Sequence, residues 1–251
     1  MDKRIGAQYY TIRDFCQTIE DFDKSCKKIA EIGYKTVQLS GIGNFDATEI
    51  KPILDKYGLE AVCTHRSPKN YLENLDKEIE FHKILGIKVC GLGIMPDFNA
   101  KPETVKKFVK NFTSVAEKLA EHGLVFAYHN HAFEFEKING KYVFDIITEA
   151  STNFKFILDV YWLAVAGINP AKFIRKYGDS IACVHFKDLK IADNQPHFAE
   201  IGHGNLEWDE IISACEEAGV EYALVEQDSC DGDPFDSLKI SYDFLKEKGF
   251  C

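Results

Sequence analysis

ACVHFKDL, residues Ala182–Leu189, is an apolar run of strand length that ends on the polar residues His185, Lys187 and Asp188. Three other apolar runs also end on polar residues: VFAYHNH (125–131), FKFILD (154–159) and YALVEQD (222–228). In parallel α/β proteins, functional groups gather at the C-terminal ends of the strands. Four strands that end on histidine, aspartate and glutamate therefore predict a metal site.

Apolar strand-like runs alternate with amphipathic helix-like segments along the whole chain. The expected strands are Ile5–Tyr10, Thr36–Ser40, Leu59–His65, Lys88–Ile94, Leu124–Asn130, Phe154–Asp159, Ile181–Asp188 and Tyr222–Asp228. The expected helices are 19–33, 47–57, 72–86, 102–123, 144–150, 169–178, 208–219 and 234–249, and a small hairpin is possible around the NGK segment.

Eight strand–helix units in 251 residues have the size and alternation of a (β/α)8 TIM barrel, an α/β fold. An open doubly wound sheet is the competing architecture. The segment QYYTIRDF at the end of the first strand lacks the glycine-rich phosphate turn typical of that alternative. Because no linker or low-complexity tract divides the chain, we expect a single domain over residues 1–251.

The composition narrows the class of protein. The formal net charge is −10, which speaks against a nucleic-acid or membrane-surface partner. No stretch approaches the roughly 20 apolar residues of a membrane span, and the N-terminus has no signal-peptide pattern. None of the eight cysteines forms a CxxC pair, so we expect reduced thiols and a cytoplasmic protein.

In a barrel the C-terminal ends of all strands share one rim. Polar residues gather at the ends of the expected strands, while the strand interiors stay apolar. They are Gln8, Gln38, His65, His129, Asn130, His131, Asp159, His185, Lys187, Glu226 and Gln227.

The motifs YHNHAFEF, LDVYWLAVAG, VHFKD, IGHGNLEW and LVEQD occur in this order. With them the chain, over nearly its whole length, resembles the sugar phosphate isomerase/epimerase family. This family comprises the xylose isomerase-like TIM barrels, among them ketose 3-epimerases, inosose dehydratases and apurinic-site endonucleases. The resemblance implies a divalent metal ion, Mn, Co, Mg or Zn, at the rim. Its ligands would include Asp159, His185 and Glu226, which match the family positions.

The fourth ligand departs from the family pattern. The family usually has Glu-Asn-His at the end of the fifth strand, where this chain has His129, Asn130 and His131. Either His129 replaces the glutamate directly, or Glu134 reaches back from the loop. We favour Glu134, because a carboxylate can serve as both ligand and base. His129 or His131 would then transfer a proton.

The resemblance implies an isomerase or epimerase that removes a proton next to a carbonyl through a metal-stabilised enediolate. Glu226 would be the base on one side of the substrate, and Glu134 or His129 the base on the other. A lyase or dehydratase of the inosose dehydratase type, acting on a keto-sugar or cyclitol, is the alternative. A non-catalytic sugar-binding barrel is the second alternative.

The expected substrate is a small sugar or cyclitol, unphosphorylated because no arginine- or lysine-rich phosphate nest is visible. Lys187 either contacts substrate or forms a salt bridge with Asp188 at the rim. Family members often pair, so a homodimer is possible. The candidate substrate-binding residues are His65, His131, Trp162, Lys187 and His203.

Overall fold

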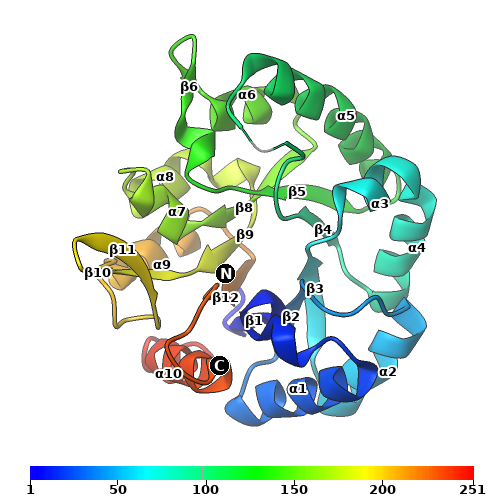
Figure 1. Ribbon diagram of the computed structural model, residues 1–251, viewed down its shortest axis with the longest axis vertical. Helices are drawn as coiled ribbons and strands as arrows, with labels where there is room; N and C mark the ends of the chain where they lie inside the picture. Colours follow the sequence, from blue (N-terminus) through cyan, green and yellow to red (C-terminus); the bar gives the residue numbers. More distant parts are fainter. Residues whose placement is uncertain (98) are drawn as a thin grey trace.

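The computed structural model describes residues 1–97 and 99–251 and shows a closed barrel of parallel strands surrounded by helices (Figure 1). Strand β1 pairs in parallel with both β2 and β12, which closes the barrel. The predicted (β/α)8 barrel is confirmed. Around the barrel the strands are β1 (Gly6–Gln8), β12 (Tyr222–Val225), β9 (Ile181–Phe186), β8 (Phe154–Asp159), β5 (Val125–His129), β4 (Val89–Leu92), β3 (Glu60–Thr64) and β2 (Thr36–Leu39).

The helices lie outside the barrel (Figure 1). They are α1 (Ile19–Ile32), α2 (Ala47–Tyr57), α3 (Pro68–Glu73), α4 (Leu75–Leu85), α5 (Pro102–Glu121), α6 (Val143–Ala150), α7 (Val160–Val165), α8 (Pro170–Tyr177), α9 (Trp208–Glu217) and α10 (Pro234–Glu247). Short 3-10 helices are η1 (Tyr9–Phe15), η2 (Phe133–Phe135) and η3 (Gly178–Ser180).

Helix α1 illustrates why these segments are helical. Thr18 caps its N-terminus by accepting a hydrogen bond from the Asp21 amide, and the helix ends at Gly33, whose φ is 128°. Phe22, Cys26 and Ile29 recur at helical spacing and are all buried. The predicted glycine stop is confirmed here.

Several predicted boundaries are wrong. The first strand ends at Gln8 rather than Tyr10, because the Gln8 side chain accepts a hydrogen bond from the Tyr10 amide and starts η1. The helix predicted over 72–86 is two helices, α3 and α4, which meet at Asn74 with a non-helical φ of −137°. Helix α7, directly after Asp159, was not predicted.

Two small hairpins extend from the barrel. The NGK segment forms the possible hairpin, between β6 (Lys137–Ile138) and β7 (Lys141–Tyr142). The other hairpin, β10 (Asp188–Ala192) with β11 (Gln195–Ala199), was not predicted.

The barrel interior places an apolar layer directly beneath the polar rim. Cys63, Val89, Ala127, Ile157, Cys183 and Leu224 belong to one buried cluster contributed by six different strands. Residues two apart on a strand face the same side. His129, Asp159, His185 and Glu226 each lie two residues beyond a member of this layer, so their side chains enter the barrel above it.

Aromatic residues fill the space between barrel and helices. Phe112 of α5 stacks on Phe126 of β5 with ring centroids 5.5 Å apart. Of the helices in the described ranges, none combines the length and apolar character that a membrane crossing needs. All eight cysteines are free thiols.

Candidate active site

His129, Asp159, His185 and Glu226 converge inside the C-terminal rim of the barrel. All four are buried, and one ligand atom from each lies within 4.8 Å of the others. We refer to these four residues as the quartet. His129, Asp159 and His185 end or nearly end β5, β8 and β9, and Glu226 follows β12. The strand register aligns them, since Asp159 pairs directly with His185.

Backbone and amide oxygens fix the tautomers of the two quartet histidines. His129 Nδ1 lies 3.2 Å from the carbonyl oxygen of Gly93. His185 Nε2 lies 2.7 Å from Oε1 of Gln38, whose own amide nitrogen donates to the Thr64 carbonyl oxygen. Because these oxygens only accept hydrogen bonds, the facing ring nitrogens carry the protons. The lone pairs of His129 Nε2 and His185 Nδ1 therefore point into the quartet.

Each of these lone pairs faces a carboxylate oxygen. His129 Nε2 lies 3.2 Å from Asp159 Oδ2, and His185 Nδ1 lies 2.9 Å from Glu226 Oε2. Pairs of acceptors at such distances repel unless a positive charge lies between them. Two imidazole nitrogens and two carboxylate oxygens form a mixed donor set that suits a divalent transition metal. The quartet therefore fits a metal ion chemically.

Asp159 is held in place from both sides. Its Oδ1 accepts hydrogen bonds from the Tyr161 and Trp162 amides and so caps α7, which leaves Oδ2 turned into the quartet. Its own amide donates to Oδ1 of Asn130. Burial raises the pKa of the Asp159 carboxyl, but the positive charge of Lys187 lowers it, and that pKa lies below its ordinary value.

Glu226 is ionised for a related reason. Burial alone would raise the pKa of its carboxyl, but the positive charge of the nearby Lys187 lowers it, and that pKa lies well below its usual range. Two carboxylates of the quartet thus carry negative charge at neutral pH, as metal ligands must.

Glu134, which the sequence favoured as the fourth ligand, lies outside the quartet. The 3-10 helix η2 turns it back onto its own loop, where it accepts hydrogen bonds from the Tyr128 hydroxyl and the His131 amide. Burial raises the pKa of the Glu134 carboxyl to about 7. The geometry therefore favours the other open alternative, and we propose His129 as the fourth ligand.

Glu134→Gln is expected to bind Mn²⁺ with wild-type affinity, whereas His129→Ala is expected to lose binding. The reason is that His129 directs a lone pair into the quartet, whereas Glu134 lies outside it. Titration of both metal-free variants with Mn²⁺ measures this. Loss of binding in Glu134→Gln with retention in His129→Ala would restore Glu134 as the ligand.

Glu134→Gln should also change how the unfolding free energy depends on pH. The raised pKa means that folded Glu134 keeps a proton that the unfolded chain releases between about pH 4.5 and pH 7. Wild-type stability from this group is therefore present at low pH and lost as the pH rises. Relative to wild type, Glu134→Gln is expected to gain about 2 kcal/mol in unfolding free energy between about pH 5 and 8, measurable by urea denaturation.

Lys187 lies against the quartet with only 1% of its side chain exposed. Its ammonium donates to Asp228 Oδ1 at 2.7 Å and Glu226 Oε2 at 3.3 Å, and lies 3.5 Å from Asp159 Oδ2. Burial lowers the pKa of Lys187, but Glu226 and Asp159 outweigh it and the pKa is raised. Three aromatic rings surround the ammonium at 5.0 to 5.8 Å: Tyr161, Trp162 and Phe198.

The predicted alternative of a salt bridge between Lys187 and Asp188 is wrong. Strand alternation sends the two side chains to opposite sides. Asp188 instead accepts hydrogen bonds from the amides of Leu189, Gly202, Gly204 and Leu206 and from the Trp208 indole. A Cβ on Gly204 would lie 2.3 Å from Asp188 Oδ1, so only glycine fits there. This carboxylate thereby ties the β10–β11 hairpin to the loop that precedes α9.

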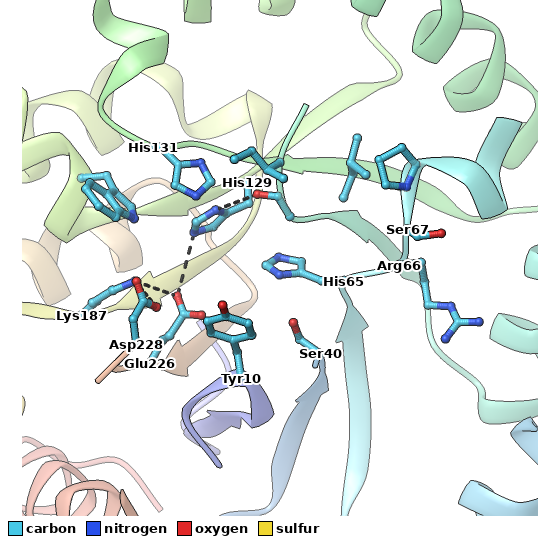
Figure 2. Close-up of a pocket in the computed structure, with 15 residues that line it drawn as sticks. Tyr10, Ser40, His65, Arg66, Ser67, His129, His131, Lys187, Glu226 and Asp228 are labelled. Carbon is cyan, nitrogen blue, oxygen red and sulfur yellow. Dashed lines mark hydrogen bonds and ion pairs between the residues drawn. The ribbon is translucent and has the colours of Figure 1, made fainter. Parts of the chain in front are cut away.

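A cavity of about 410 Å³ opens above the quartet (Figure 2). Four of the predicted substrate-binding residues line it: His65, His131, Trp162 and Lys187. His203 does not, because the loop that carries it is turned toward Asp188 and leaves it exposed. Lining residues that we did not predict are Tyr10, Ser40, Arg66, Ser67, Pro68, Leu92, Gly93, Ile94 and Asp228.

Asp228 and Arg66 could have been found from the sequence. Asp228 lies two residues beyond Glu226, so the strand period places both on one side. Arg66 directly follows His65 at a strand end. Its guanidinium points away from His129 (Figure 2) and binds the Glu78 carboxylate through two nitrogens.

Among the residues that the structure describes, three cavity nitrogens are buried without a hydrogen-bond partner: His65 Nε2, His131 Nδ1 and Trp162 Nε1. The side-chain Nε2 of Gln8 lies 3.5 Å from His65 Nδ1 and can only donate to it. His65 Nδ1 is therefore the acceptor, and His65 Nε2 carries the proton. Burial, with His129 and His185 nearby, holds the pKa of His65 well below its ordinary value. Burial also lowers the pKa of His131 to about 3, so both imidazoles are neutral. Unpartnered buried nitrogens are costly and mark sites for ligand hydroxyls.

Residues 26–248 match the model of a protein family described as the xylose isomerase-like TIM barrel. This chain belongs to that family. The match confirms the resemblance found in the sequence. A search of the curated proteins gave no match.

Solved structures share this fold over nearly the whole chain. A sugar phosphate isomerase/epimerase from Parabacteroides distasonis is 21% identical, with a TM-score of 0.79 over 98% of this chain and 94% of its own. The probable 3-DHS dehydratase AsbF from Bacillus anthracis is 15% identical, with a TM-score of 0.75 over 98% of this chain and 99% of its own. D-allulose 3-epimerase from Methylomonas sp. is also 15% identical, with a TM-score of 0.75 over 98% of this chain and 97% of its own. At these identities the similarity establishes the fold.

Proposed function

We propose that this xylose isomerase-like barrel is a metal-dependent isomerase or epimerase that removes the proton next to a carbonyl in a small neutral sugar or cyclitol. The observation that carries the proposal is the convergence of four lone-pair donors at the base of the cavity. The chemistry that a divalent metal supplies at such a quartet is Lewis-acid polarisation of a substrate carbonyl.

Glu226 is the proposed base. It lines the cavity and is held ionised beside Lys187, so it can accept a proton from the carbon next to the carbonyl. His131 is the proposed second proton-transfer group, because it is neutral, buried and unpartnered at Nδ1. The two side chains lie on either side of His129 (Figure 2). Glu226 takes the proton as a carboxylate, and His131 returns a proton that it has first taken up from solvent. A proton returned to the opposite face of the same carbon inverts that carbon, and one returned to the former carbonyl carbon moves the carbonyl.

The charges of the cavity support a neutral substrate. Of the described residues that line it, Lys187 and Arg66 are the lysine and arginine, and both already pair with carboxylates. A phosphate would have to break one of these ion pairs. The unpartnered nitrogens of His65, His131 and Trp162 instead suit the hydroxyl groups of a polyol.

A specific contact favours a lyase as the second candidate. Elimination needs one base and one acid to protonate the departing oxygen. The Glu226 carboxylate and the Lys187 ammonium lie 3.3 Å apart and both line the cavity. The structural neighbours labelled as an epimerase and as a probable dehydratase support either outcome.

Proton NMR in D2O tests the proposal. The Mn²⁺-loaded protein is incubated with a panel of neutral keto-sugars and keto-cyclitols, and deuterium at the carbon next to the carbonyl is recorded. Deuterium in an epimer or isomer supports the proposal, and a dehydrated product supports the lyase. Turnover without deuterium in either product, or failure of the wild type to bind a divalent metal, would refute the proton-abstraction mechanism.

His131→Asn is expected to keep the metal and lose turnover. Its side chain makes no hydrogen bond to the quartet, while its backbone amide still holds Glu134. Loss of a proton-transfer group lowers the rate by about a hundredfold or more. Parallel Mn²⁺ titration and D2O exchange assays measure both effects. Unchanged exchange in this variant would exclude His131 from proton transfer.

A further inference from the structure

The Lys187 ammonium lies against the same two carboxylate oxygens that complete the quartet. Asp159 Oδ2 is 3.5 Å from Lys187 Nζ, and Glu226 Oε2 is 3.3 Å from it. These are also the oxygens that face the lone pairs of His129 and His185. A cation in the quartet and the ammonium of Lys187 would therefore share one pair of anions.

Lys187 also has an anchor outside the quartet. Its shortest contact, at 2.7 Å, is to Asp228 Oδ1, and Asp228 is not one of the four quartet residues. Figure 2 shows Lys187 beside Asp228 with Glu226 next to both. The ring centroid of Phe198 lies 5.0 Å from the ammonium and adds a cation–π contact. The four-carbon stem of a lysine lets the ammonium shift while it keeps such partners.

We propose that Lys187 is a resident counter-ion of the metal site. With no metal bound, its charge pairs Asp159 and Glu226, which would otherwise be two buried carboxylates with little compensation. On metal loading the ammonium gives up those two oxygens and is retained by Asp228. Lys187 therefore stabilises the metal-free protein and weakens metal binding. This inference rests on the proposed metal function of the quartet.

Two substitutions have opposite predicted effects on metal affinity. Lys187→Met removes the competing charge, and is expected to bind Mn²⁺ about tenfold more tightly or better than the wild type while lowering the melting temperature of the metal-free protein. Asp228→Asn removes the second anchor, so Lys187 stays on the quartet oxygens and Mn²⁺ binds about fivefold more weakly or worse. The double variant is expected to follow Lys187→Met.

Isothermal titration of the metal-free full-length proteins with Mn²⁺ measures the affinities, and thermal unfolding followed by circular dichroism verifies folding. Lys187→Arg keeps the charge and is expected to bind no more tightly than wild type, which separates charge from packing. If Lys187→Met does not fold, the predicted weakening in Asp228→Asn decides alone.

Mn²⁺ affinity in folded Lys187→Met equal to or below that of the wild type would overturn the inference, as would unchanged affinity in Asp228→Asn. These outcomes leave the proposed function standing as long as wild-type protein binds Mn²⁺. If the wild type binds no Mn²⁺, both the proposed function and the inference about Lys187 are overturned. The wild-type titration shows this before any variant is compared.

Discussion

Asp159→Asn is expected to lower the affinity for a divalent metal by about a hundredfold or more and to abolish turnover. Structural zinc sites bind with about 10–16 kcal/mol shared among four ligands, so one ligand accounts for about 2.5–4 kcal/mol. The substitution replaces Oδ2, which faces the His129 lone pair, by an amide group that donates a hydrogen bond to that lone pair. The quartet then loses one anion and one free nitrogen together.

The fold should survive this change, which makes the result interpretable. The asparagine Oδ1 can still accept the hydrogen bonds from the Tyr161 and Trp162 amides that cap α7. Mn²⁺ titration and thermal unfolding of the metal-free protein measure the two effects separately. Glu134→Gln is the matched control, since it alters a buried carboxylate outside the quartet. Equal metal affinity in Asp159→Asn and wild type would remove Asp159 from the site.

Asp188→Ala is expected to destabilise the protein by about 4 kcal/mol or more. Five donors converge on this buried carboxylate, and alanine would leave all of them without an acceptor. The midpoint of thermal unfolding should fall by about 10 °C. The β10–β11 hairpin and the loop before α9 should become the first sites of proteolysis, because Asp188 joins them.

The β10–β11 hairpin also places a side chain beside Lys187. We therefore expect Asp188→Ala to disturb the candidate active site as well. Phe198 of β11 packs 4.6 Å from Tyr161, beside Lys187. The control is Asp231→Ala, because Asp231 is 95% exposed and pairs only with Lys190 among the described residues. Loss of an exposed pair should cost less than about 1 kcal/mol. Similar unfolding free energies for the two variants, measured by urea denaturation, would contradict the role assigned to Asp188.

The sequence predicted the barrel because each strand has a distinct end. Apolar runs stop abruptly at polar residues, and the barrel brings all those ends to one rim. Asp159, His185 and Glu226 were therefore predicted as neighbours although they are far apart in the chain, and their ligand atoms do meet. The β10–β11 hairpin was missed although Asp193 and Asn194, with φ of 50° and 59°, form a turn type that this dipeptide favours.

The sequence by itself determined which apolar strands end on polar residues. The barrel fold and three members of the quartet, Asp159, His185 and Glu226, follow from these strand ends. Only the tertiary structure shows that His129 turns into the quartet and Glu134 turns away from it, because both lie near the end of β5 and spacing cannot show which way a loop turns. The contact of the Gly93 carbonyl with His129 and the return of Glu134 to Tyr128 settle their directions. Hydrogen bonds between distant segments set these orientations, and sequence periodicity carries no information about such partners.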